Sequence, residues 1–125
     1  MSFSLILVTP SGVSYDGEVN YCYIPASNGP IGILPGHTPF IGRITPTGGV
    51  VHFQETNGKV RYFGVKNGAA EVKKEKTLIL SESAKEFSSL EEAKANLASL
   101  DEDGRNKSTS EKDVKIAEAL SQKNI

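Results

Sequence analysis

The first 86 residues alternate short apolar runs with residues that are typical of turns. The runs are rich in Val, Ile, Leu, Phe and Tyr, which favour strands, and they occupy residues 3–10, 17–26, 48–55, 59–66, 69–74 and 76–83. Between runs, glycine follows serine or asparagine and supplies the positive φ of a tight turn, at Ser11-Gly12, Asn28-Gly29, Asn57-Gly58 and Asn67-Gly68. Turns at intervals of about ten residues predict an antiparallel β-sandwich or barrel.

Near residue 85 the pattern changes to a helical period. One apolar stripe of a helix contains Leu90, Ala93, Leu97 and Leu100. Serine at 88 or 89, with glutamate at 91 or 92, forms a capping box before it, and Gly104 is suited to end it. The helical pattern restarts over residues 111–123, so we expect an αα-hairpin. The sequence therefore divides into a sandwich at 1–86 and a two-helix hairpin at 87–125.

This hairpin is expected to be weakly held. Helices shorter than about 12–15 residues are marginal alone in water, so packing must stabilise them. Their apolar stripes are narrow and half alanine, which limits the area they bury. We expect the hairpin to detach without unfolding the sandwich.

Composition removes several classes of function. Lys and Arg total 14 against 15 Asp and Glu, so the net charge of −1 gives no electrostatic reason to expect nucleic acid or an acidic membrane as a partner. No apolar run approaches the roughly 20 residues that cross a bilayer, and the first one lacks the basic flank of a signal peptide. We therefore expect no direct membrane insertion. Cys22, the only cysteine, lies in an alternating strand and is expected to be buried and inert.

The stretch GPIGILPGHTPFIGR, residues 29–43, combines four glycines and three prolines with five large apolar residues. Its glycines match neither phosphate-binding spacing, and no helix pattern follows them. Pro35 and Pro39 fix φ while Gly36 permits an unusual turn. The five apolar side chains, Ile31, Ile33, Leu34, Phe40 and Ile41, cannot all enter one small core. Composition leaves two interpretations open: a docking loop with an exposed apolar patch, or a well-packed corner without a partner.

No catalytic or metal-binding pattern is present in the sequence. His37 and His52 are the only histidines, and neither an H-x-x-x-H nor a G-x-S-x-G motif occurs. We expect His37 to bond nearby backbone and His52 to lie at the rim of a strand. The sequence predicts a protein that is not an enzyme.

Residues 29–48, GPIGILPGHTPFIGRITPTG, resemble the signature of the epsilon subunit of bacterial and plastid rotary, F-type ATP synthases. That signature reads acidic-Gly-x-Leu/Ile-Gly-Ile/Val-Leu-Pro-Gly-His-x-Pro. LILVTPSGVSYDGEVNYCYIPASNG is similar to the family's opening strands, YFGVKNGAAEVKKEKTLILSES to the end of its sandwich, and SSLEEAKANL to the start of its C-terminal hairpin. The resemblance is most specific around residues 29–39 and weaker after residue 100.

The resemblance implies a sandwich of about ten antiparallel strands followed by a two-helix hairpin. It implies a non-catalytic subunit of the central rotor that docks on the gamma subunit and on the ring of membrane-embedded c subunits, coupling proton flow to ATP synthesis. The hairpin would either lie folded against the sandwich or extend along the gamma subunit toward the catalytic alpha and beta subunits, where it would inhibit ATP hydrolysis. The chain would then lie peripherally on the cytoplasmic face of the bacterial inner membrane, or on the stromal face of the thylakoid.

The resemblance also assigns interface residues. The loop from Asn28 to Leu34 would contact the c ring, through Asn28, Pro30, Ile31 and Leu34. The turn at His37 would support this surface, and Phe40 and Ile41 would face the gamma subunit or the core. Relatives often carry an acidic residue where this chain has Pro30, so we expect docking by apolar burial.

Some family members bind ATP in the hairpin through an I/L-D-x-x-R motif. The matching residues here are Leu90, Glu91 and Lys94. Lys loses the bidentate fork of Arg, and Glu shifts the carboxylate by one methylene. We therefore expect no cofactor and no ATP binding by the hairpin.

The sequence leaves two functions open besides that of a rotor subunit. One is an ATP-sensing, small-molecule-binding regulatory domain. The other is an unrelated β-sandwich recognition module, which needs aromatic residues in a groove. With no Trp and four Tyr spread over several strands, the sequence offers little for that module.

Overall fold

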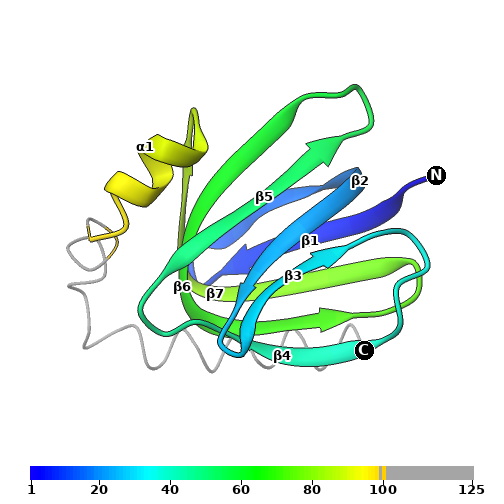
Figure 1. Ribbon diagram of the computed structural model, residues 1–125, viewed down its shortest axis with the longest axis horizontal. Coiled ribbons are helices and arrows are strands. Elements are labelled where there is room, and N and C mark those ends of the chain that lie inside the picture. Colours follow the sequence, from blue (N-terminus) through cyan, green and yellow to red (C-terminus); the bar gives the residue numbers. More distant parts are fainter. Residues whose placement is uncertain (99, 101–125) are drawn as a thin grey trace.

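The computed structural model describes residues 1–98 and 100, which form a β-sandwich followed by a short helix (Figure 1). Within this part the strands are β1 Phe3–Thr9, β2 Gly12–Ala26, β3 Gly29–Ile33, β4 Phe40–Ile44, β5 Gly49–Glu55, β6 Val60–Val72 and β7 Lys76–Phe87, and the helix is α1 Leu90–Ala95. The hydrogen-bonded path runs β1-β7-β6-β4-β2-β3, with β5 pairing with both β2 and β6. The bent strands fold this path over one core.

The core lies between the two layers because inward side chains alternate with outward ones along each strand. Leu5, Phe53 and Ile79 are fully buried. Cys22 is also fully buried, and burial raises the pKa of its thiol, so the expected inert cysteine is confirmed.

The sandwich is confirmed, but the expected strand number and pairing are wrong. The described residues form seven strands rather than about ten, because β2, β6 and β7 are 15, 13 and 12 residues long and each runs through a bend. The sheet is also mixed, since β1 pairs in parallel with β7 while the other pairs are antiparallel.

The expected turn at Asn67-Gly68 is a kink within the continuous strand β6. Asn67 has φ 53° and Gly68 has φ 154°. Before the kink, β6 pairs with β5, and after it β6 pairs with β4. A Cβ at Gly68 would collide with the carbonyl of Leu80 on β7, so glycine permits both the φ angle and the close approach of the two strands. The other expected hairpin, at Asn57-Gly58, is confirmed between β5 and β6.

Helix α1 begins where the sequence predicted. Ser89 is the N-cap, and its side chain accepts a hydrogen bond from the Glu92 N–H. The Glu92 carboxylate reaches back to the Ser88 N–H at 3.0 Å, one residue before the position of a standard capping box. The helix ends sooner than expected, at Ala95, with Asn96 as C-cap. The predicted Gly104 terminator and second helix lie outside the described residues.

Candidate functional site

A tight turn at residues 34–37 connects β3 toward β4. The His37 N–H donates to the Leu34 carbonyl at 3.0 Å, and Gly36 has φ 79°. A type II turn requires a positive φ at its third position, which glycine supplies, and it favours proline at its second position. The Gly36 N–H donates to the Lys74 carbonyl at 3.2 Å, which ties the turn to the β6–β7 connection. The backbone therefore fixes this turn.

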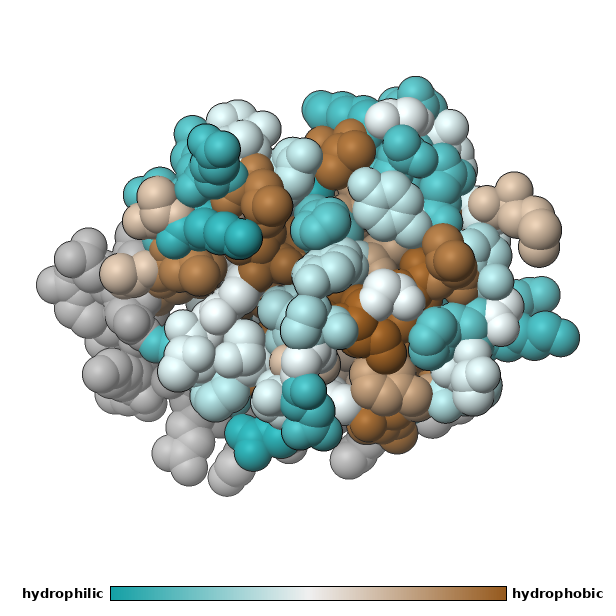
Figure 2. Space-filling model, viewed as in Figure 1, coloured by the Kyte–Doolittle hydropathy of each residue, from teal (hydrophilic) through white to brown (hydrophobic). Residues whose placement is uncertain are grey.

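The five apolar side chains around the turn divide as the sequence predicted. Ile33 is buried, and Ile31 and Phe40 are half-buried against the core. Leu34 and Ile41 are 63% and 75% exposed. Figure 2 shows brown and tan surface continuing from β3 to the start of β4. The partner of this apolar surface stays a prediction.

The expected contact loop at residues 28–34 is mostly strand, since β3 occupies Gly29–Ile33 and pairs with β2. Asn28 lies exposed in the β2–β3 turn, and Pro30 is exposed opposite Pro25. His37 is half-buried, and its Nδ1 donates to the Thr38 carbonyl at 2.7 Å, as expected for a histidine bonded to nearby backbone. His37 therefore supports the turn rather than presenting a free imidazole.

The three residues matched to the nucleotide motif do not come together. Leu90 and Lys94 line a groove of about 560 Å³ between α1 and the sandwich, whereas Glu91 is exposed and does not line it. Lys94 is the only charged side chain among the lining residues that the structure describes. A nucleoside triphosphate would bring several negative charges to one cation, so these residues do not fit it.

The sequence failed to predict the ring cluster beside this groove. Strand pairing places His52 opposite Tyr23 on one side and Tyr62 on the other, although the tyrosines are far apart in the sequence. Only the registers of β2, β5 and β6 bring these rings together. Alternation in β5 did indicate that His52 points away from the core, but it did not identify its neighbours.

Residues 1–98 and 100 contain no group of three or more His, Cys, Asp or Glu side chains placed to hold a metal ion. None of the described helical segments has the length and apolar character required to span a bilayer.

Comparison with known proteins identifies the fold and the family. Residues 2–87 match the family described as ATP synthase, Delta/Epsilon chain, beta-sandwich domain. The ATP synthase epsilon chain of Nitrosococcus oceani is 33% identical over 95 residues, 76% of this chain and 66% of that one. The epsilon chain of Alkalilimnicola ehrlichii is 35% identical over 92 residues, 74% of this chain and 64% of that one. The matched region thus spans slightly less than two thirds of either relative.

A solved structure shares the fold. In the Euglena gracilis mitochondrial ATP synthase, solved with OSCP, F1 and the c-ring, one chain superposes with a TM-score of 0.65 at 21% identity, covering 99% of this chain and 82% of that one. The sandwich domain match covers most of the present chain and agrees with both curated relatives. The chain therefore belongs to the ATP synthase delta/epsilon chain family.

Proposed function

We propose that this chain is a non-catalytic subunit of the central stalk of a rotary ATP synthase, coupling the c ring and the gamma subunit to ATP synthesis. The observation that carries the proposal is the pair of exposed apolar side chains, Leu34 and Ile41, on either side of a turn braced by backbone hydrogen bonds. A rigid apolar projection loses little conformational entropy when a partner covers it. Because the chain belongs to the ATP synthase delta/epsilon family, we look for that partner among the subunits of an ATP synthase.

The two exposed side chains are assigned to different partners. We assign the c ring to the surface of Asn28, Pro30, Ile31 and Leu34. We assign the gamma subunit to Phe40 and Ile41, and His37 supports the c-ring surface. Within these sets Leu34 and Ile41 retain the most apolar area to bury, and full burial of such a side chain is worth about 1.5–3 kcal/mol.

Copurification of the full chain with its gamma subunit and c ring tests this assignment. Leu34→Asp is expected to lose the c ring, and Ile41→Asp to lose the gamma subunit, because each places a charge in an apolar contact. Val13→Asp is the matched control, since Val13 is 64% exposed but lies near the β1–β2 turn. Retention of both partners by both aspartate variants would contradict the proposal.

The C-terminal region is proposed to inhibit ATP hydrolysis by leaving the sandwich and contacting the catalytic alpha and beta subunits. Thin packing of α1 supports this, since its only fully buried side chain is Ala93 and Leu90 is half-buried. Reconstituted motor with full-length chain is expected to hydrolyse ATP more slowly than motor with residues 1–87. Equal rates would remove the inhibitory role and leave the coupling role standing.

The proposed location follows from the proposed partners. We place the chain peripherally on the cytoplasmic face of a bacterial inner membrane, or on the stromal face of a thylakoid. In cell fractionation it should sediment with membranes that hold the c ring and be released together with the gamma subunit. Recovery in the soluble fraction while the gamma subunit stays bound to the membrane would contradict this location.

A further inference from the structure

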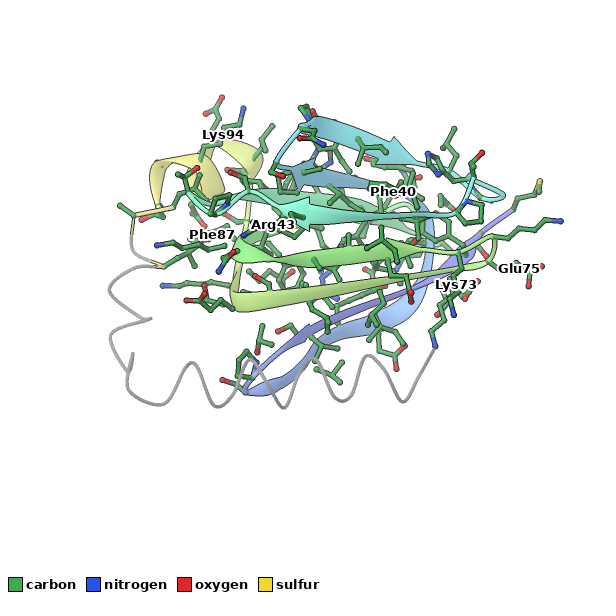
Figure 3. All side chains as sticks on the ribbon, turned by 90° about the horizontal axis from the view of Figure 1, so that it is seen from below. Phe40, Arg43, Lys73, Glu75, Phe87 and Lys94 are labelled. Atoms are coloured by element: carbon green, nitrogen blue, oxygen red, sulfur yellow. The ribbon has the colours of Figure 1, made fainter. Side chains whose placement is uncertain are left out.

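The groove between α1 and the sandwich has the size of a small-molecule site. Its volume is about 560 Å³, within the range of ligand pockets. Its walls come from β2, β5 and α1, together with Pro30 of β3 and Thr45 just after β4. Figure 3 shows Lys94 on α1, at the end of the molecule away from Lys73 and Glu75. The lining side chains that matter are Pro25, Val50, Leu90, Tyr23, His52 and Lys94.

One wall of the groove is a flat pair of rings. The Tyr23 and His52 rings stack with centroids 4.7 Å apart and an angle of 17° between their planes. Tyr62 lies 6.0 Å from His52 on the other side, and Tyr21 meets His52 edge-on at 6.2 Å. These neighbours hold the imidazole in place, while Tyr23 remains 36% exposed and available for a further ring.

The ring pair is uncharged at neutral pH. Burial lowers the pKa of His52 below its usual value, and the positive charge of Lys94 lowers it further. The imidazole is therefore neutral, and a ligand meets an apolar, polarisable surface.

Lys94 is the only charged side chain among the described residues that line the groove. It makes no salt bridge to any described carboxylate, and no acidic residue is among the described lining residues. Pro25, Val50 and Leu90 add no hydrogen-bonding side chain. The Thr45 hydroxyl also lines the groove, and it is hydrogen-bonded to the Thr47 hydroxyl at 3.1 Å. The groove thus offers one positive charge beside an apolar, aromatic surface.

We propose that this groove binds a planar aromatic molecule carrying a single negative charge, with its ring against Tyr23 and its anionic group at Lys94. A sugar would leave most of its hydroxyls without partners on the apolar walls, and a triphosphate would leave most of its charge uncompensated. The ring contact belongs to the sandwich and the charge contact to α1. The ligand therefore bridges the two elements and stabilises the docked helix, because it binds only where both are present.

Naphthalene-2-carboxylate and the neutral naphthalene-2-carboxamide are a matched pair of probes, since they differ chiefly in charge. We expect the carboxylate to bind the full chain with a dissociation constant on the order of 100 μM, and about tenfold more tightly than the carboxamide. In a titration followed by NMR, signals of His52, Tyr23 and α1 should shift together. Amide exchange in α1 should slow as the carboxylate saturates the groove.

Three variants separate the contacts. Lys94→Gln should reduce the affinity for the carboxylate to that for the carboxamide, while Lys74→Gln, at an exposed lysine elsewhere, should change neither. Tyr23→Leu keeps an apolar side chain and should weaken both probes, with the spectrum of the sandwich core as the check on folding.

Equal affinity for the two probes, shifts that avoid Tyr23 and His52, or binding of Mg-ATP as tight as that of the carboxylate would each overturn the proposal. Pro30 lines the groove and is also assigned to the c ring, but these measurements use the chain without the gamma subunit or the c ring. Their outcome therefore does not depend on the rotor assignment.

Discussion

Backbone hydrogen bonds hold the Leu34–His37 turn, whereas side-chain packing holds α1 at the opposite end of the sandwich. In Figure 3, Lys73 and Glu75 lie at the first end, and Phe87 and Lys94 lie toward the second. The turn is closed by its own backbone and tied to the Lys74 carbonyl. Apart from its covalent link to β7, α1 is held on the sandwich by a small apolar cluster around Ala93. The hydrogen-bonded turn is suited to a docking surface that keeps its shape, whereas α1, held only by packing, is suited to separate from the sandwich.

The largest effect is expected from Ala93→Asp. Ala93 is fully buried against Val50 and Phe87, so a carboxylate there either undocks α1 or is buried at high cost. We expect the docking of α1 to lose about 2–4 kcal/mol, by analogy with other buried-charge changes. Ala95→Asp, on the exposed face of the same helix, is the control. Amide exchange should accelerate in α1 and stay unchanged at residues 34–37, and acceleration at both ends would contradict the comparison.

A disulfide between positions 48 and 97 would hold α1 on the sandwich covalently, so that this end could no longer separate. An ideal Cβ on Gly48 lies 3.9 Å from the Cβ of Leu97, within the range for disulfides. Closing this loop is worth about 4 kcal/mol in chain entropy, offset by about 1–3 kcal/mol because Gly48 has φ 100°. Oxidised Gly48→Cys/Leu97→Cys chain should slow exchange in α1.

The same locked chain tests the proposed inhibition. ATP hydrolysis by reconstituted motor should be faster with the oxidised form than with the reduced form, because α1 cannot leave the sandwich. Native Cys22 is fully buried and should not interfere. Equal rates of ATP hydrolysis in both redox states would show that release of α1 from the sandwich does not regulate hydrolysis, even though α1 is weakly packed.

The turn at the first end depends on a single conformational requirement. Gly36 and Gly32 both have open space where a Cβ would be placed, but only Gly36 has a positive φ. Gly36→Ala should therefore cost about 1–2 kcal/mol in unfolding free energy, while Gly32→Ala should be nearly neutral. Denaturant titration of both variants measures the difference, and equal stabilities would show that the turn is not fixed by its backbone.

The sequence predicted more of the first end than of the second. The turn at 34–37 could be predicted because the φ preferences of proline and glycine are local. The exposure of some apolar side chains could be predicted because more apolar residues surround the turn than two short strands can point inward. Ser89 likewise marked the start of α1. The local sequence Asn67-Gly68 is typical of a turn, so it predicted one. In the structure β6 continues through this kink, and glycine is required there because the Leu80 carbonyl of β7 lies where a Cβ would be.

The groove could not be predicted because its parts are non-local. Tyr23 and His52 meet through the β2–β5 register, and Lys94 joins them through the packing of α1. Neither relation leaves a periodic signal in the sequence. Of the three residues matched to the nucleotide motif, the structure brings Leu90 and Lys94 to the groove and leaves Glu91 outside it.

The smallest effect is expected from the ion pair just before α1. Arg61 donates to both carboxylate oxygens of Glu86, at 2.7 and 2.8 Å, and this hydrogen bonding lowers the pKa of Glu86. A pKa lowered by folding adds stability above the usual carboxyl range, and that stability is lost as pH falls through the lowered value. Because Glu86 is 40% exposed, Arg61→Met should cost less than about 1 kcal/mol at pH 7.

The pH dependence distinguishes this pair from packing. The difference in unfolding free energy between the unmodified chain and Arg61→Met should shrink between about pH 5 and pH 3, as Glu86 takes up its proton. Arg43→Met, at an exposed arginine on β4, should show no such narrowing. Arg61 also pairs with Glu55, whose Oε2 lies 3.6 Å from the Arg61 Nη1. A difference that stays constant over this range would mean that Arg61 acts through its contacts with the Tyr15 and Phe63 rings, 5.1 and 5.6 Å from its guanidinium carbon, rather than through pairing with these two carboxylates.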